Sequence, residues 1–116
     1  MKMNFDELRE FQKECRNLGK KYRSLPDDLE EFRKVVTTFP RGNSKHFNVI
    51  AENEQFCIIK ARLFCRYLKG SSLRIIYAYF ESIQKIEFIE VYFKGDKENE
   101  DRSRVSQYLH DHRAAS

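Results

Sequence analysis

A run of basic residues without acids lies in the middle of this 116-residue chain. The sequence has no Asp or Glu between Glu54 and Glu81. The cations in this interval are Lys60, Arg62, Arg66, Lys69 and Arg74. Lysine suits an anionic partner as a point charge, and arginine offers a fixed fork of donors that matches a phosphate group. The pattern therefore favours an anionic partner, although Lys and Arg solvated on an ordinary exposed face remain the alternative.

The spacing of these cations predicts how they are presented. Residues 56–66 read as a strand with small or apolar residues at odd positions, whereas Lys60, Arg62 and Arg66 occupy even positions. Successive strand side chains point to opposite faces, so we expect these three cations on the face away from the core. Arg74 opens the next strand, residues 73–80, and antiparallel pairing could bring it across from Arg62–Arg66.

Two more lysines and several tyrosines extend the candidate site. Lys94 and Lys97 lie at the end of the last strand and in the turn after it, and Tyr77, Tyr79 or Tyr92 could lie beside the cations. Cations neutralise a phosphate backbone, while aromatic rings stack on unpaired bases. A single-stranded nucleic acid is therefore the predicted partner.

The histidines and cysteines give weaker signals. His46 begins a strand and could act as an acid or base, although a structural role is the simpler interpretation. His110 and His112 do not share a helical face, so we expect no metal site and no cofactor. Three cysteines, none in CxxC spacing, are typical of reduced core thiols in a cytoplasmic protein.

Length and composition indicate a single domain over residues 1–116, with 1–4 and 110–116 expected to be flexible. The net charge of +4 is mild, and 16 aromatic residues (ten Phe, six Tyr) exclude wholesale disorder. No apolar run is long enough to span a membrane, and the N-terminal residues lack the apolar core of a secretory signal.

Hydrophobic periodicity predicts the elements that position the site. An apolar stripe from Phe5 to Tyr22 predicts a first helix with a capping box at Asn4 and Glu7, and Pro26 suits the first turn of a second helix. Strands are expected at 46–51, 56–66, 73–80 and 85–94, followed by a helix at 96–109. The predicted fold is α+β: an N-terminal helical hairpin packed on a four-stranded, mainly antiparallel twisted sheet, with a C-terminal helix.

Several stretches together resemble a known family. They are Lys60-Ala61-Arg62-Leu63 through Gly70, Leu73-Arg74-Ile75-Ile76-Tyr77, Ile89 through Tyr92-Phe93-Lys94-Gly95-Asp96-Lys97, Lys20-Lys21-Tyr22-Arg23, and Leu25-Pro26-Asp27-Asp28-Leu29. In order and spacing they resemble the RelE/ParE superfamily of toxins of type II toxin–antitoxin systems, over most of residues 5–109. The resemblance implies a RelE-like fold, a cognate antitoxin, and growth arrest. In the RelE branch it implies an mRNA interferase, an endoribonuclease that blocks translation by cutting messenger RNA, often within the ribosome.

The resemblance also suggests residue roles in metal-independent attack of a 2′-hydroxyl on the adjacent phosphorus. Arg62 and Arg74 would clamp the phosphate, Lys60 would be a base candidate if neighbouring cations lower its pKa, and Lys94 or Lys97 would act as acid or phosphate contact. The RNA-binding candidates are Arg66, Lys69, Tyr77, Tyr92 and His46. The acidic residues after Lys97 depart from the family pattern, and Tyr108 either replaces a family tyrosine or packs its helix.

Two alternatives remain open at this stage. The ParE branch inhibits DNA gyrase without cleaving RNA, and a toxin-like fold can also be an inactive binding module. The basic strand face favours cleavage, since a gyrase inhibitor has no need of it. An acidic antitoxin segment is expected to cover Arg62 and Arg74, or to wrap the Leu18–Tyr22 end of the first helix.

Overall fold

The computed structural model describes residues 2–112. Its elements are β1 (Asn4–Glu7), α1 (Arg9–Lys21), α2 (Leu25–Thr38), β2 (Phe47–Glu52), β3 (Cys57–Cys65), β4 (Gly70–Phe80), a 3-10 turn η1 (Glu81–Ile83), β5 (Lys85–Phe93) and α3 (Arg102–Asp111). Of the ends expected to be flexible, residues 1 and 113–116 lie outside the described residues. Asn4 belongs to β1, and His110 and Asp111 belong to α3.

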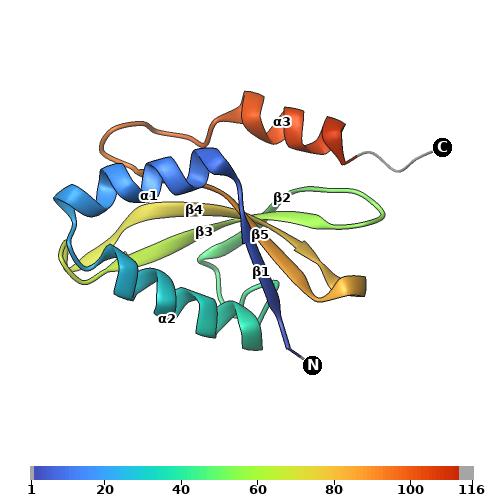
Figure 1. Cartoon of the computed structure of the whole chain (residues 1–116), viewed down its shortest axis with the longest axis horizontal. Coiled ribbons are helices and arrows are strands. Elements are labelled where there is room, and N and C mark those ends of the chain that lie inside the picture. Colours follow the sequence, from blue (N-terminus) through green and yellow to red (C-terminus); the bar gives the residue numbers. More distant parts are fainter. Residues whose placement is uncertain (1, 113–116) are drawn as a thin grey trace.

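One mixed sheet of five strands, in the order β1-β5-β4-β3-β2, forms the centre of the fold (Figure 1). The four later strands pair antiparallel, whereas β1 runs parallel to β5, with Phe5 opposite Ile86. The predicted four-stranded sheet with an N-terminal helical hairpin is therefore wrong, because a strand precedes the hairpin. The expected capping box is wrong as well, since Asn4 and Glu7 lie in β1 and the helix begins after Leu8.

The reason for this error is physical. A strand of four residues is too short to show a period of its own, and Phe5 lies three residues before Leu8, which also suits a helical stripe. The pairing partner of β1 lies about eighty residues later in the chain. Only the assembled sheet, with the edge of β5 available, favours the extended conformation.

The helices cover the two faces of the sheet unequally (Figure 1). The main core lies between the sheet and the α1–α2 hairpin and includes Phe11, Phe32 and Phe88. A smaller core lies on the opposite face, where Val105 and Tyr108 of α3 pack on side chains such as Ile58 and Ile76. Because α3 is short, it leaves part of that second face uncovered.

The segment after β5 is not helical, although the sequence predicts a helix over 96–109. Helix α3 begins at Arg102, and the Asp101 side chain caps it by accepting a hydrogen bond from the Arg104 backbone N–H at 3.0 Å. The Arg104 guanidinium also donates to both oxygens of Glu14 on α1 and to the Ile89 carbonyl. These bonds hold the first turn of α3 against α1 and β5.

The described residues contain no helix that is long and apolar enough to cross a membrane. All three cysteines are free, with Cys57 and Cys65 buried and Cys15 partly buried. Burial, reinforced by the nearby Glu7, raises the pKa of Cys15 to about 12, so its thiol stays protonated. The cysteines therefore act as apolar packing groups, as the sequence predicts.

Candidate nucleic-acid interface

Three neighbouring strands place Arg62, Arg74 and Tyr92 in one row across the sheet, which is called the cation row below. Arg62 on β3 lies directly opposite Arg74 on β4, and Arg74 lies directly opposite Tyr92 on β5. Directly opposed residues of a ladder share a face, so the three side chains lie together. This row occupies the face that α3 covers only in part, and the predicted juxtaposition of Arg62 with Arg74 is confirmed.

Arg74 is a buried cation with no ion-pair partner in the part of the chain that the structure describes. It is only 8% exposed, and its Nη1 donates to the carbonyls of Ser71 at 2.6 Å and Leu73 at 3.1 Å. Within residues 2–112, no carboxylate lies within ion-pair distance of Arg74 or Arg62. Burial, and then the charge of Arg62, lower the pKa of Arg74. An anion bound beside the pair would relieve both effects.

Tyr92 presents an unsatisfied polar group in the same row. The residue is 4% exposed, and its hydroxyl oxygen is buried without a hydrogen-bond partner among the described residues. Buried hydroxyls nearly always find a partner, so an orphan of this kind needs an explanation. The ammonium of Lys97 lies over the Tyr92 ring, 5.1 Å from its centroid. The same hydroxyl acts on Lys60 and raises the pKa of that residue, so Tyr92 connects Lys60 to the row.

Lys60 lies on the same face, two residues before Arg62, and is neutralised by Glu100. Its Nζ donates to Glu100 Oε1 at 2.9 Å. Partial burial acts to lower the pKa of Lys60, but the hydrogen bond to Glu100 and the adjacent Tyr92 outweigh it, so the pKa is raised. The condition for Lys60 to act as a base, a lowered pKa, is therefore not met. A protonated Lys60 is instead suited to donate a proton.

Glu90 and Glu100 are functional candidates that the sequence reasoning missed. Glu90 is fully buried on β5, where its carboxylate binds the Lys97 ammonium and accepts the Asp101 backbone N–H at 2.9 Å. The sequence contains a signal for Glu90, since a charged residue stands at an interior position of an apolar strand. It contains no such signal for Glu100, because the proximity of Glu100 to Lys60 depends on the path of the segment between β5 and α3.

The remaining predicted residues lie around or outside this row. Lys94 follows β5 directly, is exposed, and donates its backbone N–H to the Ser72 carbonyl at the end of the row. Arg66 and Lys69 occupy the turn between β3 and β4, beyond the ladder. His46 directly precedes β2, and its carbonyl accepts the Arg62 backbone N–H. These four residues border the row without entering it.

Tyr77 lies on the opposite side of the sheet from the cations. It is 0% exposed in the core under α1 and α2, and its hydroxyl donates to the Pro40 carbonyl at 2.7 Å. Burial raises its pKa well above the ordinary value. Tyr108 is also a packing residue, since its ring packs on Phe56 and its hydroxyl donates to Glu87 at 2.6 Å. Neither tyrosine reaches the row.

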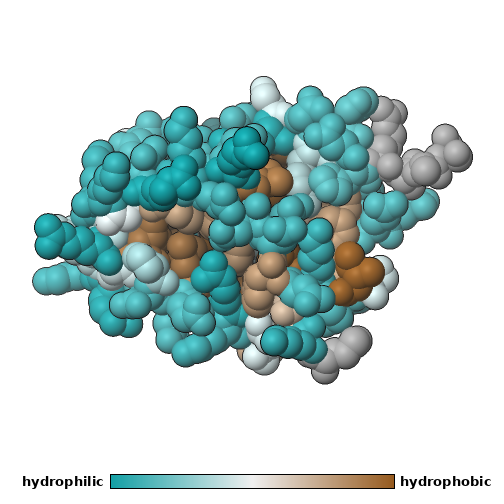
Figure 2. Space-filling view, in the orientation of Figure 1, coloured by the Kyte–Doolittle hydropathy of each residue, from teal (hydrophilic) through white to brown (hydrophobic). Residues whose placement is uncertain are grey.

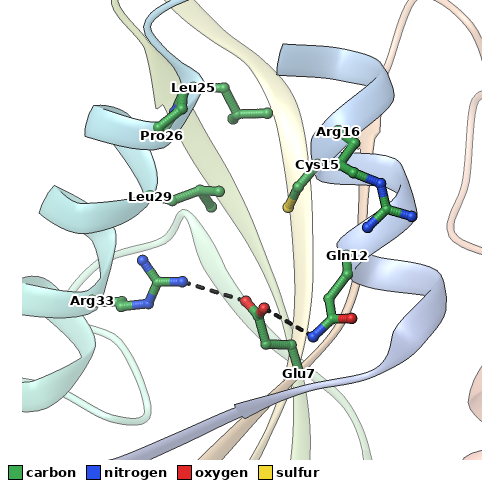
Figure 3. A pocket seen from close by; sticks show the side chains of 8 residues that line it. All are labelled: Glu7, Gln12, Cys15, Arg16, Leu25, Pro26, Leu29 and Arg33. Atoms are coloured by element: carbon green, nitrogen blue, oxygen red, sulfur yellow. Dashed lines mark hydrogen bonds and ion pairs between the residues drawn. The ribbon is translucent and has the colours of Figure 1, made fainter. Parts of the chain in front are cut away.

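A hollow between α1 and α2 on the other face of the sheet coincides with one of several apolar patches visible in Figure 2. Figure 3 shows Glu7 of β1 at one end of it, accepting a hydrogen bond from Gln12 and pairing with Arg33. Cys15 of α1 and Leu25 and Leu29 of α2 line it from the two sides. Because Arg33 is already paired with Glu7, this hollow is a weaker anion site than the row on the other face.

Metal chemistry has no obvious place in the described part of the chain. Residues 2–112 contain no group of three or more His, Cys, Asp or Glu side chains that could hold a metal ion. The groups at and beside the row are cations, a phenol and two ion pairs, Lys60–Glu100 and Lys97–Glu90. These groups bind phosphate oxygens, stabilise charge that develops on them, and transfer protons.

Comparison with known proteins supports the fold and little beyond it. No protein-family model matches the sequence, and no curated protein matches it. Among solved structures, the chain is similar to a chain of the archaeal RelE–RelB complex from Pyrococcus horikoshii OT3, with a TM-score of 0.63 and 17% identity. The match covers 84% of this chain and 100% of that one. At this identity the likeness establishes a RelE-like fold.

Proposed function

We propose that this protein is a toxin-type endoribonuclease that cleaves single-stranded messenger RNA without a metal ion. The observation that carries the proposal is the Arg62–Arg74 pair, which lies in register and has no carboxylate partner in the described chain. Such a pair is costly for the folded protein and useful to one that binds phosphate. The RelE-like fold supports the same function, since the similar solved structure is described as a RelE–RelB complex.

The proposed reaction is attack of a 2′-hydroxyl on the adjacent phosphorus. The 2′-oxygen forms a bond to phosphorus, the bond from phosphorus to the 5′-oxygen breaks, and a 2′,3′-cyclic phosphate remains. Arg62 and Arg74 bind the non-bridging oxygens and stabilise the charge that develops on them. Glu100, held by its ion pair with Lys60, accepts the 2′-hydroxyl proton, and a water molecule donates a proton to the leaving 5′-oxygen on the far side of the phosphorus.

The test is inducible expression of the wild type and of an Arg62→Ala/Arg74→Ala variant, with mapping of RNA 5′ ends. We expect growth arrest and new, clustered 5′ ends with the wild type only. An Arg9→Ala/Lys13→Ala variant, altered at exposed positions of α1, is the control and should behave like the wild type. Ends confined to translated regions would indicate cleavage on the ribosome.

Other results would contradict this function. Growth arrest with intact RNA and broken or relaxed DNA would instead favour inhibition of gyrase. Full arrest and cleavage by the Arg62→Ala/Arg74→Ala variant would show that the cation row is not the site. Harmless expression of the wild type would indicate an inactive member of the fold.

The proposal includes an antitoxin partner with an acidic, partly disordered segment. Such a segment would neutralise Arg62 and Arg74 as it folds over them, or wrap the Leu18–Tyr22 end of α1. In the first case, the Arg62→Ala/Arg74→Ala variant binds the antitoxin more weakly than the wild type, measured by calorimetry. Unchanged affinity together with protection of residues 18–22 from hydrogen exchange would favour the second case.

A further inference from the structure

A pocket opens where the edge of β3 loses its partner strand. Strand β2 begins at Phe47, which pairs with Ala61, so within residues 2–112 no strand pairs with β3 on that side beyond Arg62. The space between this open edge and α2 has a volume of about 340 Å³, within the range of small-ligand sites. The residues of this edge pocket that matter here are Val35, Asn43, His46, Arg62, Phe64 and Ser71.

The edge pocket adjoins the cation row directly. Arg62 belongs to both, and the Ser71 carbonyl that lines the pocket accepts the 2.6 Å hydrogen bond from the Arg74 guanidinium. A ligand group in the pocket would therefore lie beside a phosphate held by Arg62 and Arg74. In a nucleic acid, the group next to each phosphate is a ribose with its base.

The pocket also has the chemistry that an unstacked base requires. The Phe64 ring is 56% exposed, so it offers a flat surface for stacking. His46 has a buried Nδ1 with no hydrogen-bond partner in the described chain. This nitrogen donates or accepts depending on the tautomer, and Asn43 supplies an amide with both capacities. An apolar side chain from a protein partner would leave the His46 nitrogen unpaired.

We infer that the edge pocket is a nucleobase subsite, in which one unstacked base of the RNA stacks on Phe64 and is read by His46. The inference rests on the proposed function, because it uses the phosphate held by Arg62 and Arg74 as the anchor. The subsite would give the enzyme a preference at one nucleotide position, which a row of cations alone cannot provide.

The experiment measures binding of short single-stranded RNAs whose 2′-hydroxyls are replaced by fluorine, so that they cannot be cleaved. In one series, each base in turn is removed to leave an abasic sugar. We expect removal at one position to weaken binding to the wild type by about tenfold. Phe64→Ala should weaken binding of the intact RNA by about the same factor and add little when that base is absent. Tyr67→Ala is the control, since Tyr67 is also 56% exposed but does not line the pocket.

His46→Ala should change the order of affinities for the four bases at that position, whereas Phe64→Ala should weaken all four. An abasic series that shows no sensitive position, or a Phe64→Ala loss that persists on every abasic RNA, would overturn the subsite. The Arg62→Ala/Arg74→Ala variant separates this failure from that of the proposed function. If that variant binds the intact RNA more weakly than the wild type does, only the base subsite is wrong. If it binds the RNA as tightly as the wild type, the phosphate site is wrong as well.

Discussion

Arg62 on β3 and Arg74 on β4 are directly opposed in an antiparallel ladder, and the described chain offers neither of them a carboxylate. Like charges opposite each other destabilise a sheet, and Arg74 is largely buried as well. The arrangement therefore weakens the fold while preparing a phosphate-binding pair.

The first prediction is that Arg62→Gln stabilises the protein. Removing the exposed member of the pair relieves its repulsion with Arg74 and leaves the hydrogen bonds of Arg74 to Ser71 and Leu73 in place. We expect the free energy of unfolding to rise by about 0.5 kcal/mol in urea denaturation. Lys13→Gln, on the exposed side of α1, should leave it unchanged. A loss of stability in Arg62→Gln would mean that the repulsion is already relieved in another way.

The same substitution should weaken RNA binding in a salt-dependent manner. Each phosphate contact releases a counterion, so the logarithm of affinity falls with the logarithm of salt concentration by about 0.7 per contact for single strands. Arg62→Gln should reduce this slope by about 0.7, because one contact is lost. A titration series over several salt concentrations measures the slope. An unchanged slope would place the phosphate elsewhere.

Glu100→Gln should separate binding from cleavage. Glu100 forms an ion pair with Lys60 and repels an approaching phosphate. Removing its charge should therefore raise RNA affinity by about threefold. Cleavage should nevertheless fall by about a hundredfold, since the proposed proton acceptor is lost. Single-turnover kinetics give both quantities. Glu98→Gln, an exposed neighbour, is the matched control and should affect neither.

The Lys60–Glu100 pair should also make stability depend on pH. The hydrogen bond from Lys60 outweighs partial burial and lowers the pKa of Glu100 from its ordinary 4.5, so this contribution is present above pH 4.5 and is lost as the pH falls. The pKa of Lys60 is raised above its ordinary 10.5, so its contribution is present below that pH and is lost as the pH rises through the folded-state value.

Unfolding at several pH values checks this dependence. The free energy of unfolding of the wild type should exceed that of Glu100→Gln by about 1 kcal/mol near neutral pH, because the pair is only partly exposed. The difference should disappear as the pH falls well below 4.5. A difference that is constant with pH would mean that the two charges do not interact in solution.

Two Tyr→Phe variants should have opposite consequences. Tyr77→Phe removes the buried hydrogen bond to the Pro40 carbonyl, so it should cost about 1 kcal/mol of stability and leave RNA affinity unchanged. Tyr92→Phe removes a hydroxyl that makes no hydrogen bond within residues 2–112 and interacts only with the nearby Lys60, so it should cost little stability but weaken RNA binding by several fold. Urea denaturation and RNA titration of both variants measure the contrast. If Tyr77→Phe weakened RNA binding and Tyr92→Phe did not, the interface would lie on the face of the sheet opposite the cations.

Much of the site could be predicted from local pattern. Odd positions of β3 from Cys57 to Cys65 are buried, while Arg62 and Phe64 are exposed, as a period of two requires. The short turn between β3 and β4 makes their pairing antiparallel, and this brings Arg74 to Arg62. Such relationships depend on neighbours in the chain, so alternation and turn length are enough to predict them.

Tyr77 and Tyr92 could not be assigned to a face in this way. Residues 73–80 are buried throughout and residues 86–92 likewise, because helices cover parts of both faces, so hydrophobicity does not alternate. The register shift between Ile76 and Tyr77 in the pairing with β5 adds to the ambiguity. Their faces are determined only by which strands they pair with.

The sequence by itself therefore determined the cationic strand face and the antiparallel pairing of the four later strands, since each depends on local spacing. The tertiary structure alone decided that Asn4–Glu7 joins the sheet beside β5, that Glu100 reaches Lys60, and that no acid of the described residues pairs with Arg62 or Arg74. These outcomes involve residues tens of positions apart. Their energies arise from long-range pairing and burial, which appear only when the whole sheet is assembled.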